Sequence, residues 1–463
     1  MLSYVSMTLS QLRHKHPRLI YRDFKVKQDE KNLQISFNFL LEPDIVFTPE
    51  ILIPVMNRES RPGVGAPAIK NLAFHLGLVE AINYWKAACP PELVVEAGYL
   101  SPDQIAWWRY LFIHGLGEFF YRNRIDFTTP DFLTIRSTQR SNLCSLQRLD
   151  LNGDLILVGG GKDSIVTMET LKEISETKNV LMVNPGPNSI SAVSLAGYQD
   201  PIVITRKIDP ALLQLNKQGY LNGHTPFSAY LAFLGVFVAK LHGYKNVISS
   251  NELSAGEASL IYKSMEINHQ YSKSFIFEKK FRDYSRRYLT DKVEYFSFLR
   301  PLYELQIAKQ FSRLTKYDSA FTSCNVGRGK FWCGQCPKCA FSYLSLFPFM
   351  DSDRLNRIFG RDLFEVPEIQ NHILDLVGLG GYKPFDCVGT KDESVLAAAL
   401  AIKKTKNQQE FLISLEQKLN LNDQESVKKL EGRIMENWSD QNFLPSEYST
   451  ILNRRLLAKP GVS

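Results

Sequence analysis

The sequence predicts an α/β protein whose core is a parallel sheet, preceded by an N-terminal α+β region and followed by a mostly helical region. From Asp154 onward, short apolar runs alternate with helical stretches, which is typical of a parallel sheet covered by helices on both faces. Before this point, residues 20–57 alternate apolar and polar side chains, as half-buried strands do. After Asp351 the pattern is mostly helical. We therefore predict three domains, at residues 1–150, 151–350 and 351–463.

The N-terminal region is predicted to combine a small sheet with two helices. The strand-like alternation is clearest in Leu33–Phe39, and the helices are expected over Phe74–Ala88 and Pro102–Tyr121. The second helix is rich in aromatic residues, which we expect in the core rather than on a stacking platform, because such side chains bury much apolar surface. These residues are Trp107, Trp108, Tyr110, Phe112, Phe119 and Phe120.

The central region is predicted to alternate strands and helices. The strands are expected at Leu155–Val158, Asn179–Asn184, Pro201–Thr205 and Asn246–Ser250, and the helices over Lys162–Ile174 and Phe227–Leu241. Ligands in such sheets bind beyond the carboxyl ends of the strands. The segment Gly159–Ser164 follows the first of these strands, so we expect it at the ligand site.

The C-terminal region is predicted to be a helical cap or lid. A glycine-rich segment, Gly378–Cys387, interrupts its helical pattern. The candidate helices are Leu396–Lys403, Gln409–Leu419 and Ser426–Met435.

The composition favours a soluble, cytoplasmic protein and makes no prediction of oligomeric state. The formal net charge of +7 suits an anionic small molecule as well as RNA. No basic run is interleaved with aromatic residues, so we expect no stable nucleic-acid partner. Residues 1–18 are unlike a signal peptide, and the most apolar helix, Phe227–Val238, is too short to cross a membrane, so we expect no membrane association.

The glycine turn, Gly159–Ser164, is predicted to hold a phosphate. Glycines let the backbone approach a ligand closely, and the N–H groups and dipole of the following helix favour an anion. The spacing fits neither the common phosphate loop nor the dinucleotide fingerprint. The turn resembles the Ser-Gly-Gly-x-Asp-Ser loop of the PP-loop ATP pyrophosphatases, with Gly159 in place of the first serine. This resemblance implies cleavage of ATP between the α and β phosphates; the alternative is an ordinary strand–helix turn.

Four of the seven cysteines form the second motif, with C-x8-C-x2-C-x2-C spacing. Four thiolates at short spacing can close a tetrahedral structural zinc site. The alternative is a set of buried or redox cysteines. The spacing resembles the zinc site of the PP-loop cyano-deazaguanine synthases, which makes those enzymes a rival interpretation. The four residues are Cys324, Cys333, Cys336 and Cys339.

Further motifs distinguish the two interpretations, because together they resemble the UDP-N-acetylmuramoyl-L-alanyl-L-glutamate epimerase family over most of the chain. They are Tyr21–Phe24, Gly117–Arg122, Asn251–Glu257, Asn268–Ser274, Leu299–Glu304, Ser323–Asn325, Trp332–Cys339 and Tyr382–Gly389. Deazaguanine synthases are about half this length and lack both flanking regions. The resemblance implies a PP-loop core that inverts the terminal L-glutamate of UDP-MurNAc-L-Ala-L-Glu, using ATP and Mg²⁺ and releasing AMP and diphosphate.

The resemblance also implies roles for individual residues. The glycines Gly159, Gly160 and Gly161, with Lys162 and Ser164, would hold the phosphates; Asp163 would hold Mg²⁺ or orient the phosphates; and Val183 and Asn184 would contact adenine. Inversion needs a base on one face of the α-carbon and an acid on the other, or one residue that reaches both. The candidates are His269, Lys273, Glu257 and Cys387, and the sequence does not choose among them.

Three cationic residues are predicted to bind carboxylates or phosphates of the substrate, and one of them, Arg328, can equally be a surface charge beside the cysteine motif. They are Arg300, Arg328 and Lys383. Two other functions stay open at this point. One is a PP-loop ligase or nucleobase-modifying enzyme that acts on a deazapurine or a tRNA base. The other is a non-catalytic ATP-binding module.

Overall fold

A computed structural model describes residues 7–55, 63–139, 150–174, 177–327, 331–405, 409–421 and 423–457. Its main feature is one sheet of 11 strands, with a separate two-stranded hairpin. The strands are β1 (Arg18–Gln28), β2 (Asn32–Leu41), β3 (Ile45–Phe47), β4 (Glu50–Pro54), β5 (Glu92–Val95), β6 (Thr134–Ser137), β7 (Asp154–Leu157), β8 (Lys178–Val183), β9 (Ile202–Lys207), β10 (Asn246–Ser249) and β13 (Glu294–Ser297). The hairpin is β11 (Leu260–Tyr262) and β12 (Met265–Ile267).

The strands of the central region of the chain form a parallel half of the sheet, as the alternating pattern predicts. Its order is β13-β10-β7-β8-β9, and every neighbouring pair is parallel. Later strands add to both sides of β7, with β8 on one side and β10 on the other. The chain therefore reverses its direction of growth at β7, and ligands of open α/β sheets bind at such a point.

The N-terminal strands extend this sheet instead of forming a separate small one, which corrects that part of the prediction. β4 pairs antiparallel with β9, and the order continues through β2, β1, β5 and β6. Local alternation predicts that residues form a strand, but not which strand they pair with. The predicted boundary at residue 150 follows residues 140–149, which lie outside the described part of the chain, and the three-domain division stays a prediction.

Two hydrophobic cores lie on opposite faces of the sheet. Side chains alternate along a strand, so Leu155 of β7 joins one core and Ile156 the other. On the first face, α2 (Ala66–Trp85) packs against β1, while α8 (Phe227–His242) packs against β7 and α2. The predicted aromatic cluster lies in this core: Trp108, Phe112, Phe119 and Phe120 are buried, and Trp107 and Tyr110 are partly buried against it.

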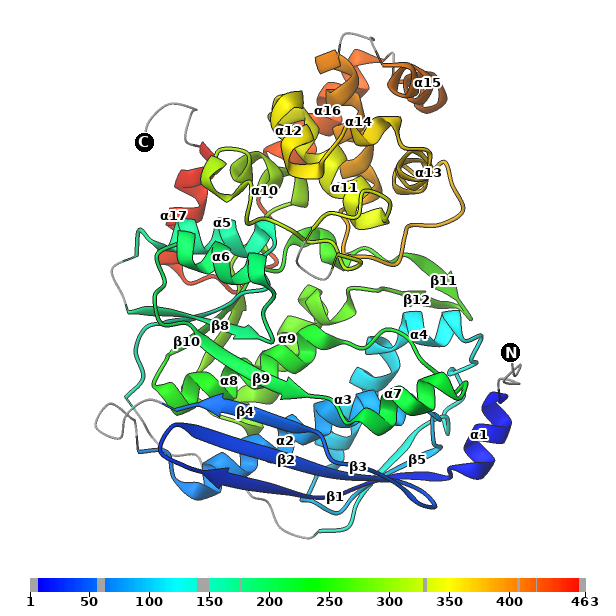
Figure 1. Cartoon of the computed structure of the whole chain (residues 1–463), viewed down its shortest axis with the longest axis vertical. Coiled ribbons are helices and arrows are strands. Elements are labelled where there is room, and N and C mark those ends of the chain that lie inside the picture. The colour runs from blue at the N-terminus through cyan, green and yellow to red at the C-terminus, as the bar shows by residue number, and fades with distance from the viewer. Residues whose placement is uncertain are drawn as a thin grey trace.

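The C-terminal region is helical, as predicted, and joins the second core. Figure 1 shows α11 to α16 gathered at one end of the molecule and β1 to β4 at the other. Two helices precede this region, α10 (Glu304–Phe311) and α11 (Pro337–Leu346), and its own helices are α12 (Ser352–Phe359), α13 (Pro367–Leu376), α14 (Lys391–Thr405), α15 (Glu410–Leu419), α16 (Gln424–Met435) and α17 (Ser446–Leu457). The last helix returns to the sheet, where the Tyr448 hydroxyl donates to Asp154 Oδ1 at 2.6 Å.

The other helices cover the sheet or its edges. They are α1 (Leu9–Lys15), α3 (Pro102–Gly115), α4 (Gly117–Arg122), α5 (Lys162–Leu171), α6 (Pro187–Leu195), α7 (Pro210–Lys217) and α9 (Phe275–Tyr288). Short 3₁₀ turns occur at Leu253–Gly256, Tyr271–Lys273, Thr315–Tyr317, Phe347–Phe349 and Leu363–Glu365. Among the described residues, no helix is long and apolar enough to cross a membrane.

Two helical glycines give opposite predictions for stability. Gly77 lies in α2, where an added Cβ would overlap the Tyr21 hydroxyl, so Gly77→Ala should destabilise the protein by about 1–3 kcal/mol. Gly432 lies in α16, and an added Cβ would meet no described atom within 4 Å. Gly432→Ala should therefore stabilise by up to about 1 kcal/mol through helix propensity. Urea unfolding measures both, and equal midpoints for the two variants would contradict the packing described for α2.

Candidate active site

A pocket of about 410 Å³ lies where the parallel strands end. The glycine turn after β7 forms one wall, and Ser250 and Asn251 after β10 form the next. Thr322–Asn325 and the Asp386–Cys387 pair close the opposite side. Segments more than 200 residues apart in the chain thus meet at the sheet edge that the strand pattern predicts. A second cavity, of about 530 Å³, lies between α14 and α16 and shares no lining residue with this one.

The glycine turn is shaped by close contacts at two of its three glycines. Gly160 has φ +85°, and an added Cβ would overlap Ser189 at the start of α6. At Gly161 an added Cβ would lie 2.7 Å from Ser323 Oγ. Gly159 is different, because a Cβ there would meet no described atom within 4 Å. The turn therefore needs glycine at position 160, would require Ser323 to move for a side chain at 161, and has room for a side chain at 159.

The first turn of α5 faces this pocket with unused donors. Gly161 is the N-cap residue, and no described side chain caps the helix. Ser164 donates its hydroxyl to the Gly161 carbonyl at 2.9 Å and lines the pocket with Asp163. Free N–H groups at a helix start, with the positive end of the helix dipole, favour a bound anion.

Lys162 lies below the turn and does not line the pocket. Its ammonium is buried, forms an ion pair with Glu304 and lies 2.5 Å from Asp163 Oδ1. Burial opposes its charge, but the two carboxylates hold the pKa of Lys162 above its usual value. The charge of Lys162 is matched by these carboxylates, and the phosphate contact predicted for it stays a prediction.

Three carboxylates converge beside Lys162. Oxygens of Asp163, Glu252 and Glu304 lie within 4.8 Å of one another. Burial and the neighbouring Asp163 raise the pKa of Glu304 to about 7, and burial raises that of Glu252. Glu252 Oε1 is buried and has no hydrogen-bond partner among the described residues. Three cations, Lys273, Lys162 and Arg300, lie close by, yet this oxygen has no hydrogen-bond partner among the described residues; a divalent cation would fit such a set.

The sequence predictions give neither Glu252 nor Glu304 a role, although both lie in segments that carry the family resemblance. A usable signal was present: each follows a strand that neighbours β7 or β10 in the parallel sheet. Carboxylates after adjacent parallel strands reach the same edge.

A second cluster joins three of the four predicted acid–base candidates. Lys273 Nζ donates to Cys387 Sγ at 3.2 Å, and both residues line the pocket. His269 lies against the same sulfur, and its Nδ1 is 2.5 Å from Glu118 Oε2. Burial would raise the pKa of Cys387, but Lys273 and His269 lower it to about 6. Burial opposes charge on His269 too, yet its hydrogen bonds with Cys387 and Glu118 raise its pKa to about 9.

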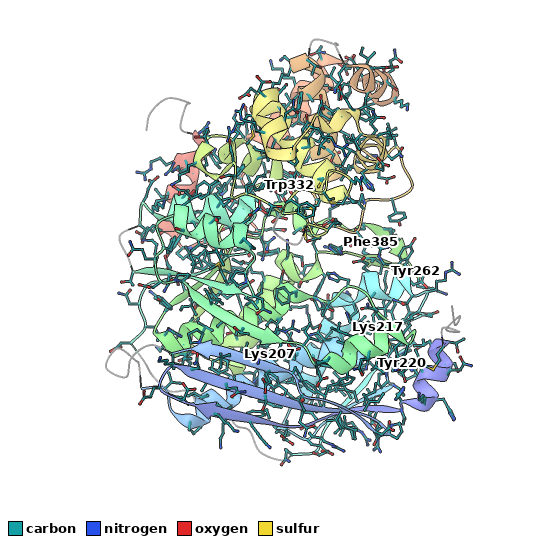
Figure 2. The ribbon with its side chains drawn as sticks, viewed as in Figure 1. Lys207, Lys217, Tyr220, Tyr262, Trp332 and Phe385 are labelled. Carbon is teal, nitrogen blue, oxygen red and sulfur yellow. The ribbon has the colours of Figure 1, made fainter. Side chains whose placement is uncertain are left out.

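Backbone contacts fix Cys387 in this cluster. Lys338, at the start of α11, donates to the Cys387 carbonyl, and Gln270 donates to the Val388 carbonyl at 3.1 Å. Asp386 Oδ1 accepts from the Cys387 N–H at 2.8 Å and from Asn325 at 3.2 Å. Figure 2 shows the neighbouring Phe385 where the helical end meets the rest of the molecule. The glycine-rich segment predicted as part of a lid is therefore docked onto the pocket.

Glu257, the fourth acid–base candidate, lies elsewhere. It forms an ion pair with Lys383 at 3.0 Å, and neither residue lines the pocket. The two charges neutralise each other, so the structure favours neither the acid–base role predicted for Glu257 nor the substrate contact predicted for Lys383.

The guanidinium of Arg300 is bonded within the protein, and the substrate contact predicted for Arg300 stays a prediction. The side chain is buried, and its guanidinium donates to Glu278 Oε2 at 3.0 Å and to the carbonyls of Glu252 and Lys273 at 2.5 Å. Arg300 therefore braces the segments that carry Glu252 and Lys273. Arg328 lies outside the described residues.

An apolar wall completes the pocket and can hold a flat ring. Val183, predicted to contact adenine, is part of this wall, whereas Asn184 does not line the pocket. The Asn184 amide donates to the Arg206 carbonyl at 2.7 Å and its oxygen accepts from the Arg206 N–H at 3.0 Å. The adenine contact of Asn184 stays a prediction. The wall consists of Leu157, Leu181, Val183, Phe227 and Leu231.

The four predicted metal-binding cysteines form one cluster. Their sulfurs are 3.5 Å apart for Cys336 and Cys339, 3.7 Å for Cys333 and Cys339, and 3.9 Å for Cys324 and Cys336. The N–H groups of Gly327 and Cys333 donate to Cys324 Sγ at 3.3 and 3.4 Å. This donor set fits a tetrahedral zinc ion. The cluster joins the start of α11 to the segment that carries Ser323 and Asn325 into the pocket.

Comparison with known proteins gives consistent matches over most of the chain. Residues 11–298 match the family described as the MurL N-terminal domain, and residues 319–430 match the MurL C-terminal domain. A protein of Xanthomonas oryzae pv. oryzae named UDP-N-acetyl-alpha-D-muramoyl-L-alanyl-L-glutamate epimerase is 35% identical, over 78% of this chain and 82% of that protein. Proteins of the same name from Salinispora tropica and a Micromonospora species are 39% and 37% identical, each over 70% of this chain and 72% and 73% of their own length. No solved structure matches the chain.

Two substitutions in the glycine turn test its geometry. Gly160→Ala puts a side chain at φ +85° and against Ser189, so we expect a loss of about 1–3 kcal/mol in stability. Gly159→Ser enters open space, and its stability should stay within about 0.5 kcal/mol of the starting protein. Urea unfolding of the two variants side by side gives the answer. A Gly159→Ser variant that is the less stable of the two would contradict this geometry.

Proposed function

The chain belongs to the UDP-N-acetyl-alpha-D-muramoyl-L-alanyl-L-glutamate epimerase family, and from this premise we propose that it inverts the terminal glutamate of UDP-MurNAc-L-Ala-L-Glu with the help of ATP. It is an enzyme of the isomerase class, as its relatives are named. The observation that carries the ATP-dependent reaction is the shared pocket: the glycine turn and the Cys387–Lys273 pair line the same cavity. An activated carboxyl group and a proton-transfer group can therefore meet there.

Activation is proposed because the α-proton beside a carboxylate is very weakly acidic. Its removal would place a second negative charge on a group that already carries one. In the proposed first step, an oxygen of the α-carboxylate of the terminal glutamate attacks the α-phosphorus of ATP, and diphosphate leaves. The acyl group can then accept the electron pair of the departing α-proton as an enolate. After reprotonation on the opposite face, water attacks the acyl carbon and releases AMP and the free D-glutamyl product.

The nucleotide is proposed to lie along the glycine turn. The N–H groups at the start of α5 and the Ser164 hydroxyl would hold its phosphates. A PP-loop has a serine where this chain has Gly159, and the Ser323 hydroxyl, which faces Gly161 across the pocket, would supply the missing donor. The apolar wall around Val183 would hold adenine.

The cation is proposed to bind Asp163, Glu252 and Glu304. The fit rests on three convergent carboxylates and on the unpartnered, buried Glu252 Oε1. Carboxylate oxygens are the ligands that Mg²⁺ prefers. When bound, Mg²⁺ supplies positive charge that neutralises the phosphates during their transfer. Asp163 belongs both to this set and to the pocket lining, so the set borders the phosphate site.

A zinc ion is proposed for the cluster of four cysteines, where it would have a structural role. Four thiolates fill the coordination shell and leave no open position for catalysis. The ion would hold the start of α11, and with it Lys338, against the pocket segment that contains Ser323.

The direct test of the function follows two products at once. Purified protein with UDP-MurNAc-L-Ala-L-Glu, ATP and Mg²⁺ should release AMP and convert the glutamate to the D form, measured by nucleotide chromatography and chiral analysis after hydrolysis. Asp163→Asn should abolish both outcomes, because it removes a carboxylate of the proposed cation site. Cys387→Ser should block inversion and largely spare AMP formation, because Cys387 is assigned to proton transfer and not to ATP.

Three results would oppose this proposal. If glutamate stays L without AMP release while carboxy-deazaguanine is converted, the deazaguanine-synthase alternative is favoured. Binding of ATP without turnover of either substrate would favour a binding module. Equal loss of AMP release and inversion in Cys387→Ser would refute the division of roles. Glu42→Gln serves as a control, because Glu42 pairs with Arg18 and lines no part of the pocket.

Metal analysis tests the cysteine cluster independently of activity. Protein purified under reducing conditions without chelators should contain about one zinc ion per chain, as measured by inductively coupled plasma mass spectrometry. Cys336→Ser should lose most of the zinc, whereas Cys387→Ser should retain it, because Cys387 lies outside the cluster. Zinc-free protein, or equal zinc in both variants, would refute the site.

A further inference from the structure

We propose that Glu118 is a positioning residue for the inversion: it holds His269 against Cys387, so that the sulfur faces the pocket as a thiolate able to accept the α-proton. This inference rests on the proposed function for the identity of the substrate. The contacts among Glu118, His269 and Cys387 stand independently of it. The sequence predicts no role for Glu118, although the residue lies in Gly117–Arg122, one of the segments that carry the family resemblance.

Glu118 is buried and has a cationic partner on each oxygen. Its Oε1 accepts from Arg122 Nε at 2.5 Å, one helical turn further along α4, and its Oε2 lies 2.5 Å from His269 Nδ1. The preceding glycine seats it there: a Cβ at Gly117 would lie 3.3 Å from Ile267. A Cβ at this position would make a tight contact with the Ile267 side chain, so glycine eases the approach of α4 to β12, and His269 follows β12 by two residues.

The contact with Glu118 selects one of two neighbouring histidines. The rings of His224 and His269 lie 4.4 Å apart, and His224 Nδ1 is 3.6 Å from the same Glu118 oxygen. Burial and the charge of His269 lower the pKa of His224 to about 3, whereas that of His269 is raised to about 9. The carboxylate thus supports one imidazolium, and it is the one beside Cys387.

Cys387 receives positive charge from three separate elements. Lys273 is 3.2 Å from its sulfur, His269 touches it from the turn after β12, and Lys338 reaches its carbonyl from α11. One carboxylate is equally near, because Asp386 Oδ1 accepts from the Cys387 N–H at 2.8 Å, whereas Glu118 lies behind His269. The titratable and charged groups that face this cluster are Glu118, Arg122, His224, His269, Lys273, Lys338, Asp386, Asp163 and Glu252.

The arrangement gives each group a defined task in the proton transfer. The thiolate takes the α-proton and becomes a thiol, while the electron pair of the broken C–H bond moves into the activated acyl group. His269 and Lys273 stay protonated and stabilise the sulfur's charge before the transfer. Glu118 takes no proton; it fixes the orientation and charge of His269, as a buried carboxylate does for the histidine of a hydrolase triad.

The test is a pH profile of Cys387 alkylation in the full-length protein without substrates. Iodoacetamide modifies thiolates, and mass spectrometry of the peptide that contains Cys387 gives the rate at each pH. The starting protein should show a midpoint near pH 6, the value to which Lys273 and His269 lower the pKa of Cys387. Glu118→Gln should move the midpoint upward by about one unit or more, because neutral glutamine no longer supports the His269 charge.

Further variants separate positioning from general damage. Glu118→Asp keeps the charge but shortens the side chain, so its midpoint should lie between those of the starting protein and Glu118→Gln. Glu42→Gln removes a carboxylate from another arginine pair and should leave the midpoint unchanged. His269→Gln should shift the midpoint like Glu118→Gln, and combining the two should add little, because both changes remove the same imidazolium. If Glu118→Gln does not fold, Glu118→Asp carries the test, because its shorter side chain draws the carboxylate back from His269, and an unchanged midpoint in that variant overturns the inference.

The failure of this inference differs from the failure of the proposed function. An unchanged midpoint in Glu118→Gln overturns the inference, even if the protein inverts glutamate and His269→Gln shifts the midpoint. A shifted midpoint in a protein that neither inverts glutamate nor releases AMP supports the inference about the thiolate and removes its assigned reaction. If both hold, Glu118→Gln should lower the inversion rate at pH 7 about 2-fold or more, because a midpoint raised by one unit roughly halves the thiolate at that pH, and should leave AMP formation nearly intact.

Discussion

The buried ion pair between Lys162 and Glu304 is the contact on which the site depends. Lys162 is the first residue of α5 and Glu304 the first of α10, so this pair ties the helix after the glycine turn to the helix that follows β13. Leaving a charge buried without its partner costs several kcal/mol, of the order of 3–5. Removing Lys162 would leave three carboxylates crowded together, whereas removing Glu304 would leave the buried ammonium with Asp163 as its remaining carboxylate partner. The pair fixes the spacing between the two helices and keeps the glycine turn open to the pocket.

Much of the fold could be predicted because local patterns report local structure. The strands and helices around β7, β8, β9 and β10 follow from apolar runs and periodicity, and the glycine turn marks the sheet edge where the pocket lies. Pairing between strands that are distant in the chain has no local sequence pattern. The sequence therefore predicts a small N-terminal sheet but not the antiparallel pairing of β4 with β9.

The candidate site shows the same division between local and distant information. His269, Lys273 and Cys387 have side chains whose chemistry suits proton transfer, and the fold brings them together. Arg300 has equally suitable chemistry for binding a carboxylate, but its partners are fixed by tertiary packing that no single segment encodes. Conversely, the partner of His269 is Glu118, about 150 residues earlier in the chain, and only the folded arrangement reveals it.

The joint between β4 and β9 also determines how the molecule can be divided. Each of these strands would become an open sheet edge if the chain were cut near residue 150 and the two parts were produced separately. Exposed edges pair readily with other chains, so such fragments would be prone to aggregate when alone. Produced together, they present matching edges and could reassemble through the same register, in which Ile51 faces Arg206. The continuous sheet thus makes the protein a candidate for fragment complementation and a poor one for study as isolated parts.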